Sequence, residues 1–327
     1  MEGATGFLGM QYTTLGGKKG IKVSKIGIGV WQASGDWKAG DDDVIKAVGK
    51  VHDLGVNLVD TAEAYGAGHS ETVLGKALKQ FGRDNFVVAT KVNGGHLRYE
   101  ELQKAAAASM RRLGIKEIDV YQVHWPDPWE QIPLKYTMKA MEKLYVEGKI
   151  RAIAVSNFAV RDLEEARSYL SRADIVSNQL RYNLVQRDIE DEVIPYCRKN
   201  NIAIIAWSPL AQGALTGKYS VGKVPKGDVR DLNLLFEPAN LSQIAKLVEV
   251  LSSVAKHHKR LISQVALNWL ATMPGVIPIP GVKSATQAAE NVGSLDFEIT
   301  KKELDAIESA AARVKVDYLP TEKPLTA

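Results

Sequence analysis

Short apolar segments rich in β-branched residues recur along the chain, and each is followed by a longer segment with helical periodicity. Most of the short segments are continuously apolar, as expected of strands that are covered on both faces. Eight segments have the length and composition of such strands: 25–29, 57–60, 86–90, 118–122, 152–155, 175–179, 203–207 and 276–279. The pattern therefore predicts eight strands that alternate with helices.

The predicted helices have recognisable ends. Residues 41–43 are all Asp and begin a helix that runs to Leu54, where negative charge complements the helix dipole. Gly55 follows this helix, and Gly114 and Gly148 follow two later ones, in the position of a left-handed C-terminal cap. These glycines mark the ends of successive helices, as expected of a βα unit that repeats along the chain.

An unbroken βα alternation of this kind fits a closed (β/α)8 barrel, the TIM barrel, better than an open doubly wound α/β sheet. The interval 208–275 is longer than the others and holds a Gly- and Pro-rich loop, an extra helix over 241–257 and a helix over 262–271. Segments 12–15 and 21–23 flank a Gly-rich turn and predict a β-hairpin that covers the barrel floor.

No linker or low-complexity segment interrupts the pattern, so we expect one domain. Its parts are a flexible leader (1–10), the hairpin (12–23), the barrel (25–291) and a C-terminal helix and tail (300–327), which together span 1–327.

Two features suggest a short-chain dehydrogenase, a class of dinucleotide-binding enzymes. Residues 3–9 (GATGFLG) look like a pyrophosphate-binding loop, and Tyr145 and Lys149 have the spacing of a catalytic Tyr-x-x-x-Lys pair. Such a loop needs a strand before it and a helix after it, but only two residues precede Gly3 and a hairpin follows. Gly148 also separates Tyr145 from Lys149. We therefore assign residues 3–9 to the leader.

Composition narrows the class of partner. The formal net charge is +4, and Lys and Arg are spread along the chain rather than gathered into a nucleic-acid or membrane surface. The dense basic cluster 256–260 is expected to be a solvated helix end. The single cysteine, Cys197, excludes an internal disulfide and is expected in the core. No apolar run approaches the ~20 residues of a membrane span, so we expect a cytoplasmic protein with a small-molecule partner.

Polar side chains stand where the early strands end, and in an α/β barrel catalytic groups come from these C-terminal ends. Asp60 ends the second predicted strand, Tyr65 follows it, Lys91 ends the third and His124 follows the fourth. A tyrosine, whose ordinary pKa is about 10, becomes a useful acid when an ammonium stabilises its anion and a carboxylate holds that ammonium. The four residues predict a tuned general acid.

The segments that carry these residues resemble the aldo-keto reductases, barrel enzymes that transfer hydride between NADPH and carbonyl compounds. The specific segments are 60–65 with Ser70 and Glu71, 89–91, and 122–126, and the resemblance covers nearly the whole chain. It implies that Tyr65 protonates the carbonyl oxygen, that Lys91 lowers the pKa of Tyr65 and that Asp60 pairs with Lys91. By the same resemblance, His124 orients the carbonyl and assists proton delivery.

The resemblance also implies where the cofactor binds. Ser156, Asn157 and Gln179 would hold the nicotinamide carboxamide, and Trp207 would stack on the ring. Tryptophan at that position is similar to the branch that includes potassium-channel β subunits and several bacterial and plant reductases. The remaining implied contacts cover the pyrophosphate (Ser208, Leu210, Gln212, Gly213, Leu215, Gly217 and Lys218) and the adenosine end (Gly281, Lys283, Gln287, Glu290 and Asn291).

Cofactor choice depends on two of these residues. Lys283 is placed to meet the ribose 2′-phosphate, whereas Gln287 stands where many members carry an Arg. We expect NADP(H) rather than NAD(H), with Lys283 supplying the positive charge.

Trp31, Trp37, Trp125 and Trp129 fall in loops on the same rim and predict walls for apolar or aromatic carbonyl compounds, although Trp37 and Trp129 equally suit loop packing. His96 and Arg98 are expected to face solvent. The predicted function is NADP(H)-dependent reduction of aldehydes or ketones to alcohols, without a metal. The alternative is a non-catalytic or weakly catalytic barrel that binds NADP(H) and regulates a partner.

Overall fold

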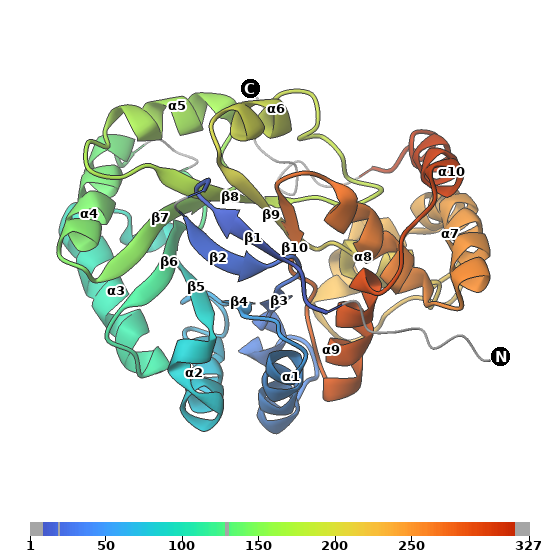
Figure 1. The fold of residues 1–327 in the computed structure, drawn as a ribbon, viewed down its shortest axis with the longest axis horizontal. Coiled ribbons are helices and arrows are strands. Elements are labelled where there is room, and N and C mark those ends of the chain that lie inside the picture. The colour runs from blue at the N-terminus through green and yellow to red at the C-terminus, as the bar shows by residue number, and fades with distance from the viewer. Residues whose placement is uncertain (1–8, 19, 128–130, 318–327) are drawn as a thin grey trace.

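The computed structural model describes residues 9–18, 20–127 and 131–317. Eight parallel strands pair in sequence order, and a bridge between Gly29 and Gly281 closes the sheet into a barrel (Figure 1). The strands are β3 (Ile28–Gly29), β4 (Leu58–Asp60), β5 (Val87–Val92), β6 (Ile118–Val123), β7 (Ile150–Ser156), β8 (Ile175–Arg181), β9 (Ala203–Trp207) and β10 (Val276–Pro278). The predicted (β/α)8 barrel is confirmed.

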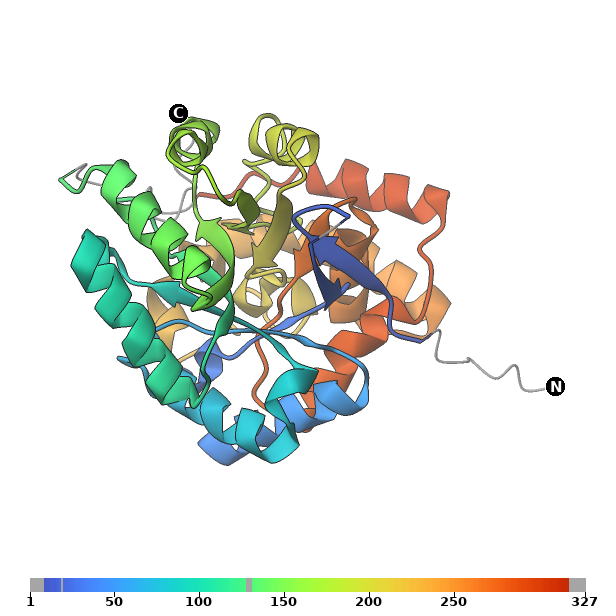
Figure 2. The same cartoon turned by 60° about the vertical axis from the view of Figure 1, so that its left-hand side comes forward.

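Helices surround the barrel on all sides (Figures 1 and 2). They are α1 (Asp41–Asp53), α2 (His69–Phe81), α3 (Tyr99–Leu113), α4 (Leu134–Val146), α5 (Val160–Ser168), α6 (Val193–Lys199), α7 (Pro238–His258), α8 (Ile262–Thr272), α9 (Ala285–Val292) and α10 (Lys301–Ala311). The predicted ends hold: α1 begins at Asp41, and Gly55, Gly114 and Gly148 all have positive φ. The extra helix of the long interval is α7.

The barrel interior is apolar in its lower part. Leu58, Ala89, Val120, Ala154 and Ile205, each from a different strand, belong to one cluster of buried side chains. Outward-facing residues of the same strands pack against the helices in two larger clusters. Because side chains alternate along a strand, the next inward position on each strand lies one level higher, towards the C-terminal rim.

The hairpin of β1 (Tyr12–Leu15) and β2 (Ile21–Ser24) crosses the N-terminal end of the barrel (Figure 1). Leu15 and Val23 are fully buried and belong to the interior cluster, and the Ser24 amide donates to Asn57 Oδ1 over 2.7 Å. The hairpin therefore covers the barrel floor, as its position in the sequence predicts.

The first barrel strand is shorter than the sequence predicts. The Lys25 amide donates to the Gln11 carbonyl, so this residue extends the hairpin rather than the barrel. The third predicted strand is longer: β5 runs through Lys91 to Val92 and is buried along its whole length. Lys91 consequently lies inside the barrel wall and not in the loop after it.

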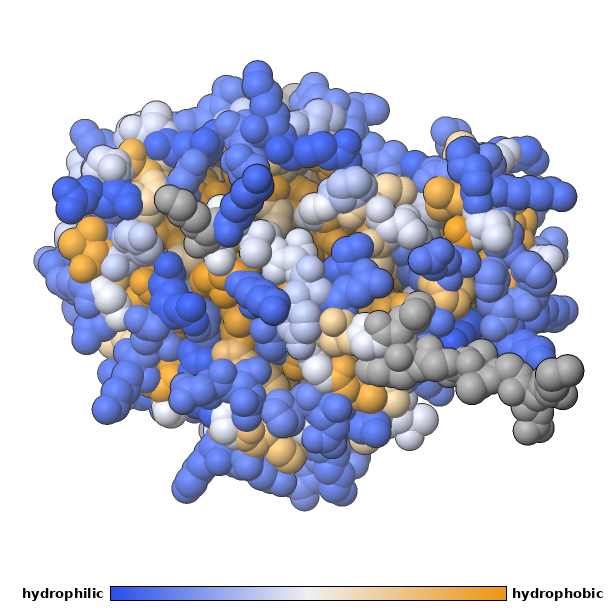
Figure 3. Space-filling model, in the orientation of Figure 1, coloured by the Kyte–Doolittle hydropathy of each residue, from blue (hydrophilic) through white to orange (hydrophobic). Residues whose placement is uncertain are grey.

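The face of the molecule in Figure 3 is mostly hydrophilic, with apolar side chains scattered between charged ones. Among the residues that the structure describes, no helix has the length and apolar character needed to cross a membrane. Cys197 is fully buried in α6, and burial raises the pKa of its thiol to about 12. The predicted core position of this cysteine is confirmed. Residues 3–8 of the Gly-rich stretch lie outside the described residues.

Candidate active site

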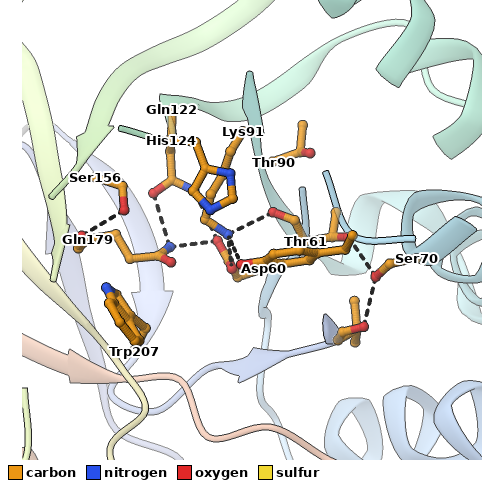
Figure 4. A network of polar contacts seen from close by, with 12 residues as sticks. Asp60, Thr61, Ser70, Thr90, Lys91, Gln122, His124, Ser156, Gln179 and Trp207 are labelled. Carbon is orange, nitrogen blue, oxygen red and sulfur yellow. Dashed lines mark hydrogen bonds and ion pairs between the residues drawn. The ribbon is translucent and has the colours of Figure 1, made fainter. Parts of the chain in front are cut away.

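A polar level stands directly above the apolar interior. Asp60 follows Leu58 by two residues, and Lys91 follows Ala89 in the same way, so each polar side chain points into the barrel above an apolar one. The same spacing places Gln122, Ser156 and Gln179 on this level, and Figure 4 shows these side chains pointing toward one another. Period-two alternation thus builds the site from neighbouring strands.

Lys91 is the centre of this level and is fully buried. Its ammonium lies 2.5 Å from Asp60 Oδ1, 2.9 Å from the Thr61 carbonyl oxygen and 3.1 Å from the Tyr65 hydroxyl. An ammonium has three hydrogens, so these three acceptors use all of them. Because the Tyr65 oxygen accepts from Lys91, its own hydrogen must point elsewhere, and Tyr65 lines the open cavity above.

Asp60 is held on its other side by two amides. Gln122 Nε2 donates to Asp60 Oδ2 over 3.0 Å, and Gln179 Nε2 donates to the same oxygen over 2.7 Å. Gln179 Nε2 also donates to Gln122 Oε1 over 3.1 Å. Hydrogen bonds to the charged form of a buried carboxylate offset its loss of water, so the two amides support the ion pair between Asp60 and Lys91.

Burial and charge act against each other on Tyr65. Burial raises the pKa of the phenol above its ordinary value, Lys91 acts in the opposite direction and Asp60 adds to the rise. Burial alone would lower the pKa of Lys91, but Asp60 and Tyr65 more than offset this and the pKa is raised. The predicted direction of the Lys91 effect is correct, yet the net pKa of Tyr65 is raised rather than lowered. Tyr65 therefore carries its proton at neutral pH.

His124 follows β6, and its ring meets the Tyr65 ring edge-on with the centroids 5.7 Å apart. Burial, helped by the charge of Lys91, lowers the pKa of His124 to about 3. The imidazole is therefore neutral at pH 7 and offers one N–H donor to the cavity that it lines.

The lowered pKa of His124 predicts a pH dependence of stability. The unfolded chain binds a proton on His124 below pH ~6.5, whereas the folded chain does so only near pH 3, so protons favour unfolding between these values. As the pH is lowered through this window, His124 should decrease the free energy of unfolding by up to about 1.4 kcal/mol per pH unit. In the His124→Gln variant, urea titrations between pH 7 and 4 should give a shallower slope. Identical slopes for the variant and the wild type would contradict the argument.

Asn157 links three parts of the rim. Its Nδ2 donates to the His124 carbonyl and to Ser156 Oγ, both over 3.0 Å, and its Oδ1 accepts from Trp207 Nε1 over 3.2 Å. Ser156 Oγ in turn donates to the Gln179 carbonyl over 2.8 Å. Ser156 and Asn157 line the cavity, but their donors bind other groups of the protein, and the Asn157 Oδ1 acceptor orients the Trp207 ring.

Several rim residues hold a strained backbone. Asn157, Ser208, Ala211 and Gln212 have φ of +63°, +49°, +48° and +53°, in the left-handed region that side chains other than glycine rarely adopt. Strain of this kind costs of order 1–3 kcal/mol per residue and concentrates at functional sites. Its position around one cavity supports a binding role for this rim.

The cavity above the polar level has a volume of about 710 Å³ and extends from Tyr65 to α9. Most of the predicted site residues line it: Asp60, Tyr65, His124, Ser156, Asn157, Gln179, Trp207, Ser208, Leu210, Gln212, Gly213, Lys218, Gly281, Lys283, Gln287, Glu290 and Asn291. Glycine at position 281 has a steric explanation, because a Cβ at this position would lie 2.2 Å from Gln32 Nε2.

Three predicted residues do not line this cavity. Lys91 lies beneath it and reaches it through Tyr65. Leu215 is fully buried in the core, where η4 (Ala211–Thr216) packs on α7 and α8. Gly217 lies in a separate shallow hollow, and a Cβ there would meet Ile262 at 2.7 Å, so its role is close packing.

The three described tryptophans of the predicted substrate pocket all line the cavity. Trp31 stacks on Tyr65 with ring centroids 5.8 Å apart and meets Trp37 edge-on at 4.9 Å. Trp37 itself is almost fully buried. Lys283 Nζ donates to the Trp37 carbonyl over 2.8 Å, which makes this residue a link between two loops as well as a wall. Trp129 lies outside the described residues.

Arg230 and Gln32 are two of several lining residues that were not predicted from the sequence. Arg230, in η5 (Val229–Leu232), stacks its guanidinium on the Trp37 ring at 5.4 Å and pairs with Asp228 at 2.6 Å. Gln32, in η1 (Trp31–Ser34), has a buried Oε1 without a partner in the described part of the chain, and so does Trp37 at Nε1. Both residues line the cavity with other parts of their side chains, while these two atoms are buried.

The basic cluster 256–260 is not simply a solvated helix end. Lys256 and Arg260 line the far end of the cavity, while His257 and His258 contact Glu303 of α10. His96 and Arg98 are exposed, as expected, and stand apart from the cavity with Glu63 and Glu101 as their partners.

This protein is a closed α/β barrel that carries an acid, an amine, a phenol and an imidazole at its C-terminal rim. That arrangement is typical of barrel enzymes. Residues 25–312 match the model of the aldo/keto reductase family. An uncharacterized oxidoreductase of Mycobacterium tuberculosis is 39% identical over 298 residues, covering 89% of this chain and 90% of that protein. The chain belongs to the aldo/keto reductase family, a family of oxidoreductases.

Two further comparisons bear on the site. An NADH-specific methylglyoxal reductase of Escherichia coli is 32% identical, covering 87% of this chain and 93% of that protein. The crystal structure of an aldo-keto reductase from Klebsiella pneumoniae in complex with NADPH is similar with a TM-score of 0.76 and 27% identity, covering 97% of this chain and 99% of that one. The likeness to the branch with tryptophan at position 207 stays a prediction.

Proposed function

We propose that this protein reduces aldehydes or ketones to alcohols with NADP(H), and that Tyr65 is the general acid. The observation that carries this proposal is the hydrogen-bond pattern of Lys91. Its three hydrogens are used by Asp60, Thr61 and Tyr65, which directs the Tyr65 proton toward the cavity. A positioned donor of this kind suits proton transfer to an oxygen that gains negative charge.

The residues of the cavity fit a nicotinamide dinucleotide. Such a cofactor supplies the hydride when it is bound. Trp207 presents an aromatic face held by Asn157, and Gln179 Oε1 has no partner among the described residues and suits an amide donor.

Cations gather where the phosphates would lie. Burial lowers the pKa of Lys283, and the positive charges of Arg230 and Lys38 lower it further. Arg230 Nη1 also donates to the Gln212 carbonyl over 3.3 Å, which ties η5 to η4 across the cavity. Like charges held this close are stabilised when an anion binds between them, so the cluster supports a phosphate-bearing ligand.

Each residue of the site then has a separate role in the proposed reaction. Asp60 fixes the Lys91 ammonium, and Lys91 stabilises the phenolate that forms when Tyr65 gives up its proton. Neutral His124 donates a hydrogen bond to the substrate oxygen and orients it toward Tyr65. After turnover, a proton from solvent must return to Tyr65.

The walls of the cavity favour apolar or aromatic carbonyl compounds. Trp31 and Trp125 line the cavity with aromatic rings, and Trp31 stacks on Tyr65, whereas the nearly buried Trp37 ring lies against Arg230 and Lys283. We therefore propose aromatic and medium-chain aldehydes as substrates.

The direct test is consumption of NADPH or NADH by the purified protein with a panel of aldehydes and ketones, followed at the absorbance of the reduced cofactor. We expect turnover with NADPH and aromatic aldehydes. Binding of cofactor without turnover on any carbonyl would replace the proposal with the regulatory barrel. Turnover with NADH alone, as the name of the E. coli relative describes for that protein, would correct the cofactor and leave the chemistry intact.

Lys283→Ala tests the cofactor assignment. Loss of one charged hydrogen bond, typically about 1.5–3 kcal/mol, should weaken NADPH binding about 10-fold or more and leave NADH binding nearly unchanged. Fluorescence titration with both cofactors measures this difference. Lys79→Ala removes an exposed lysine of α2 outside the cavity and is the matched control. Equal weakening of both cofactors would remove the 2′-phosphate role from Lys283.

A further inference from the structure

Three metal-ligating side chains converge outside the cavity, where the last turn of α7 meets the first turn of α10. His257 Nδ1 lies 2.7 Å from Glu303 Oε1, and His258 Nε2 lies 2.9 Å from Glu303 Oε2 and 3.1 Å from Oε1. Each residue offers one ligand atom, and these atoms lie within 4.8 Å of one another. None of the three lines the active-site cavity.

The convergence of the two histidines is not typical of a helix, because neighbouring helical residues point about 100° apart. Here the helix stops directly after them: Lys259 has φ of +53° and caps α7. The His257 and His258 ring centroids are 4.8 Å apart, and the His258 ring rests 5.1 Å from the Phe297 ring. Use of Nδ1 on one ring and Nε2 on the other lets both reach the same carboxylate.

Glu303 is also fixed in place. It is the third residue of α10, and its Oε2 accepts from the Thr300 amide over 2.9 Å and from Thr300 Oγ1 over 2.7 Å, as in a capping box. Partners behind a ligand carboxylate orient it and strengthen metal binding. The two helices that supply the ligands pack against each other, and both contribute side chains, among them Leu251 and Ile307, to the same buried apolar cluster (Figure 1).

Two of the nearby cations are paired with acids of their own. Arg260 lies 3.8 Å from Asp296 Oδ2, and Lys301 pairs with Asp305 one turn along α10. Positive charge close to the two imidazoles is therefore partly neutralised, and the single carboxylate of Glu303 remains for a cation.

We propose that His257, His258 and Glu303 form a Zn²⁺ site that joins α10 to α7, with water as the fourth ligand. Two imidazoles and a carboxylate are typical zinc ligands, whereas Ca²⁺ and Mg²⁺ take oxygen ligands. Tetrahedral Zn²⁺ with bonds of about 2.0–2.1 Å separates its ligands by about 3.4 Å. The present His–Glu separations of 2.7–3.1 Å need to open by about 0.3–0.7 Å, and ligand atoms that lie up to 4.8 Å apart need to move closer by up to about 1.4 Å.

The site has a structural consequence that does not depend on the proposed reductase activity. Lys256 and Arg260, on either side of the histidines, line the far end of the cavity. Bound zinc would fix the C-terminal end of α7, which carries Lys256 and Arg260, and would hold α10 against α7.

The test uses tag-free full-length protein, freed of metal with a chelator, and calorimetric titration with ZnCl2. We expect one Zn²⁺ per chain and a higher melting temperature with zinc. The His257→Gln/His258→Gln variant should lose both effects. Glu303→Gln keeps a residue type that completes a capping box, so the helix start is preserved, and it should weaken zinc binding about 10-fold or more.

His69→Gln is the matched control, since His69 pairs with a single acid, Asp41, at 2.9 Å and has no second histidine beside it. This variant should bind zinc as the wild type does. Absence of a stoichiometric binding step in the wild type would overturn the proposal. So would unchanged binding or an unchanged zinc-dependent shift in the double variant, because the cluster would then be only a set of hydrogen bonds between helices.

Discussion

The Tyr65→Phe variant is expected to bind NADPH as tightly as the wild-type protein and to reduce carbonyl compounds about 10²- to 10⁴-fold more slowly, the usual contribution of a positioned acid. The substitution removes only the hydroxyl that Lys91 contacts at 3.1 Å, and the ring can still stack on Trp31. Steady-state kinetics and cofactor titration separate the two effects.

Tyr121→Phe is the matched control for this variant. Tyr121 is fully buried in β6, and its hydroxyl has no hydrogen-bond partner within the described residues. Its loss should leave kcat unchanged. If Tyr65→Phe turns over as fast as Tyr121→Phe, Tyr65 is not the proton donor.

The Lys91→Met variant is expected to lose both activity and stability. Removal of the ammonium leaves Asp60 as an uncompensated buried charge, which typically costs about 3–5 kcal/mol. It also removes the positive charge next to the Tyr65 oxygen, so kcat should fall by about 10²-fold or more. Urea unfolding and steady-state kinetics on the same preparation measure the two losses.

A second substitution distinguishes the causes of these losses. Asp60→Asn in the Lys91→Met background removes the remaining charge, so most of the lost stability should return while activity stays low. An equally unstable double variant would show that packing, not the buried charge, sets the stability. A Lys91→Met protein with wild-type kcat would contradict the proposed role of Lys91.

The barrel and the polar level were predictable because both follow from simple periodicity. Continuous apolar segments identify covered strands, and a polar residue two positions after an inward apolar one must lie above it. Gln122 obeys this rule, between Val120 and His124, and its contact with Asp60 could have been inferred from the same alternation.

Other features depend on the path of loops, which no periodicity encodes. Arg230 reaches the cavity from a segment far from any strand end, and its place is set by contacts with Trp37 and Asp228. Leu215 sits in a Gly-rich segment that reads as a phosphate loop, but the turn of η4 directs its side chain into the core. The raised pKa of Tyr65 also needed the structure, because the effect of burial outweighs that of the Lys91 charge.

The junction between β3 and β10 also bears on how the protein folds. Gly27 and Gly29 donate to the carbonyls of Pro278 and Pro280, which joins segments from opposite ends of the barrel sequence. We expect contacts between such distant segments to form late in folding, because closing a long loop costs the most conformational entropy. Gly29, Pro280 and Gly281 also line the cavity, so the ligand site is completed only when this last junction closes. Recovery of ligand binding during refolding therefore reports barrel closure itself, after the rest of the sheet has assembled.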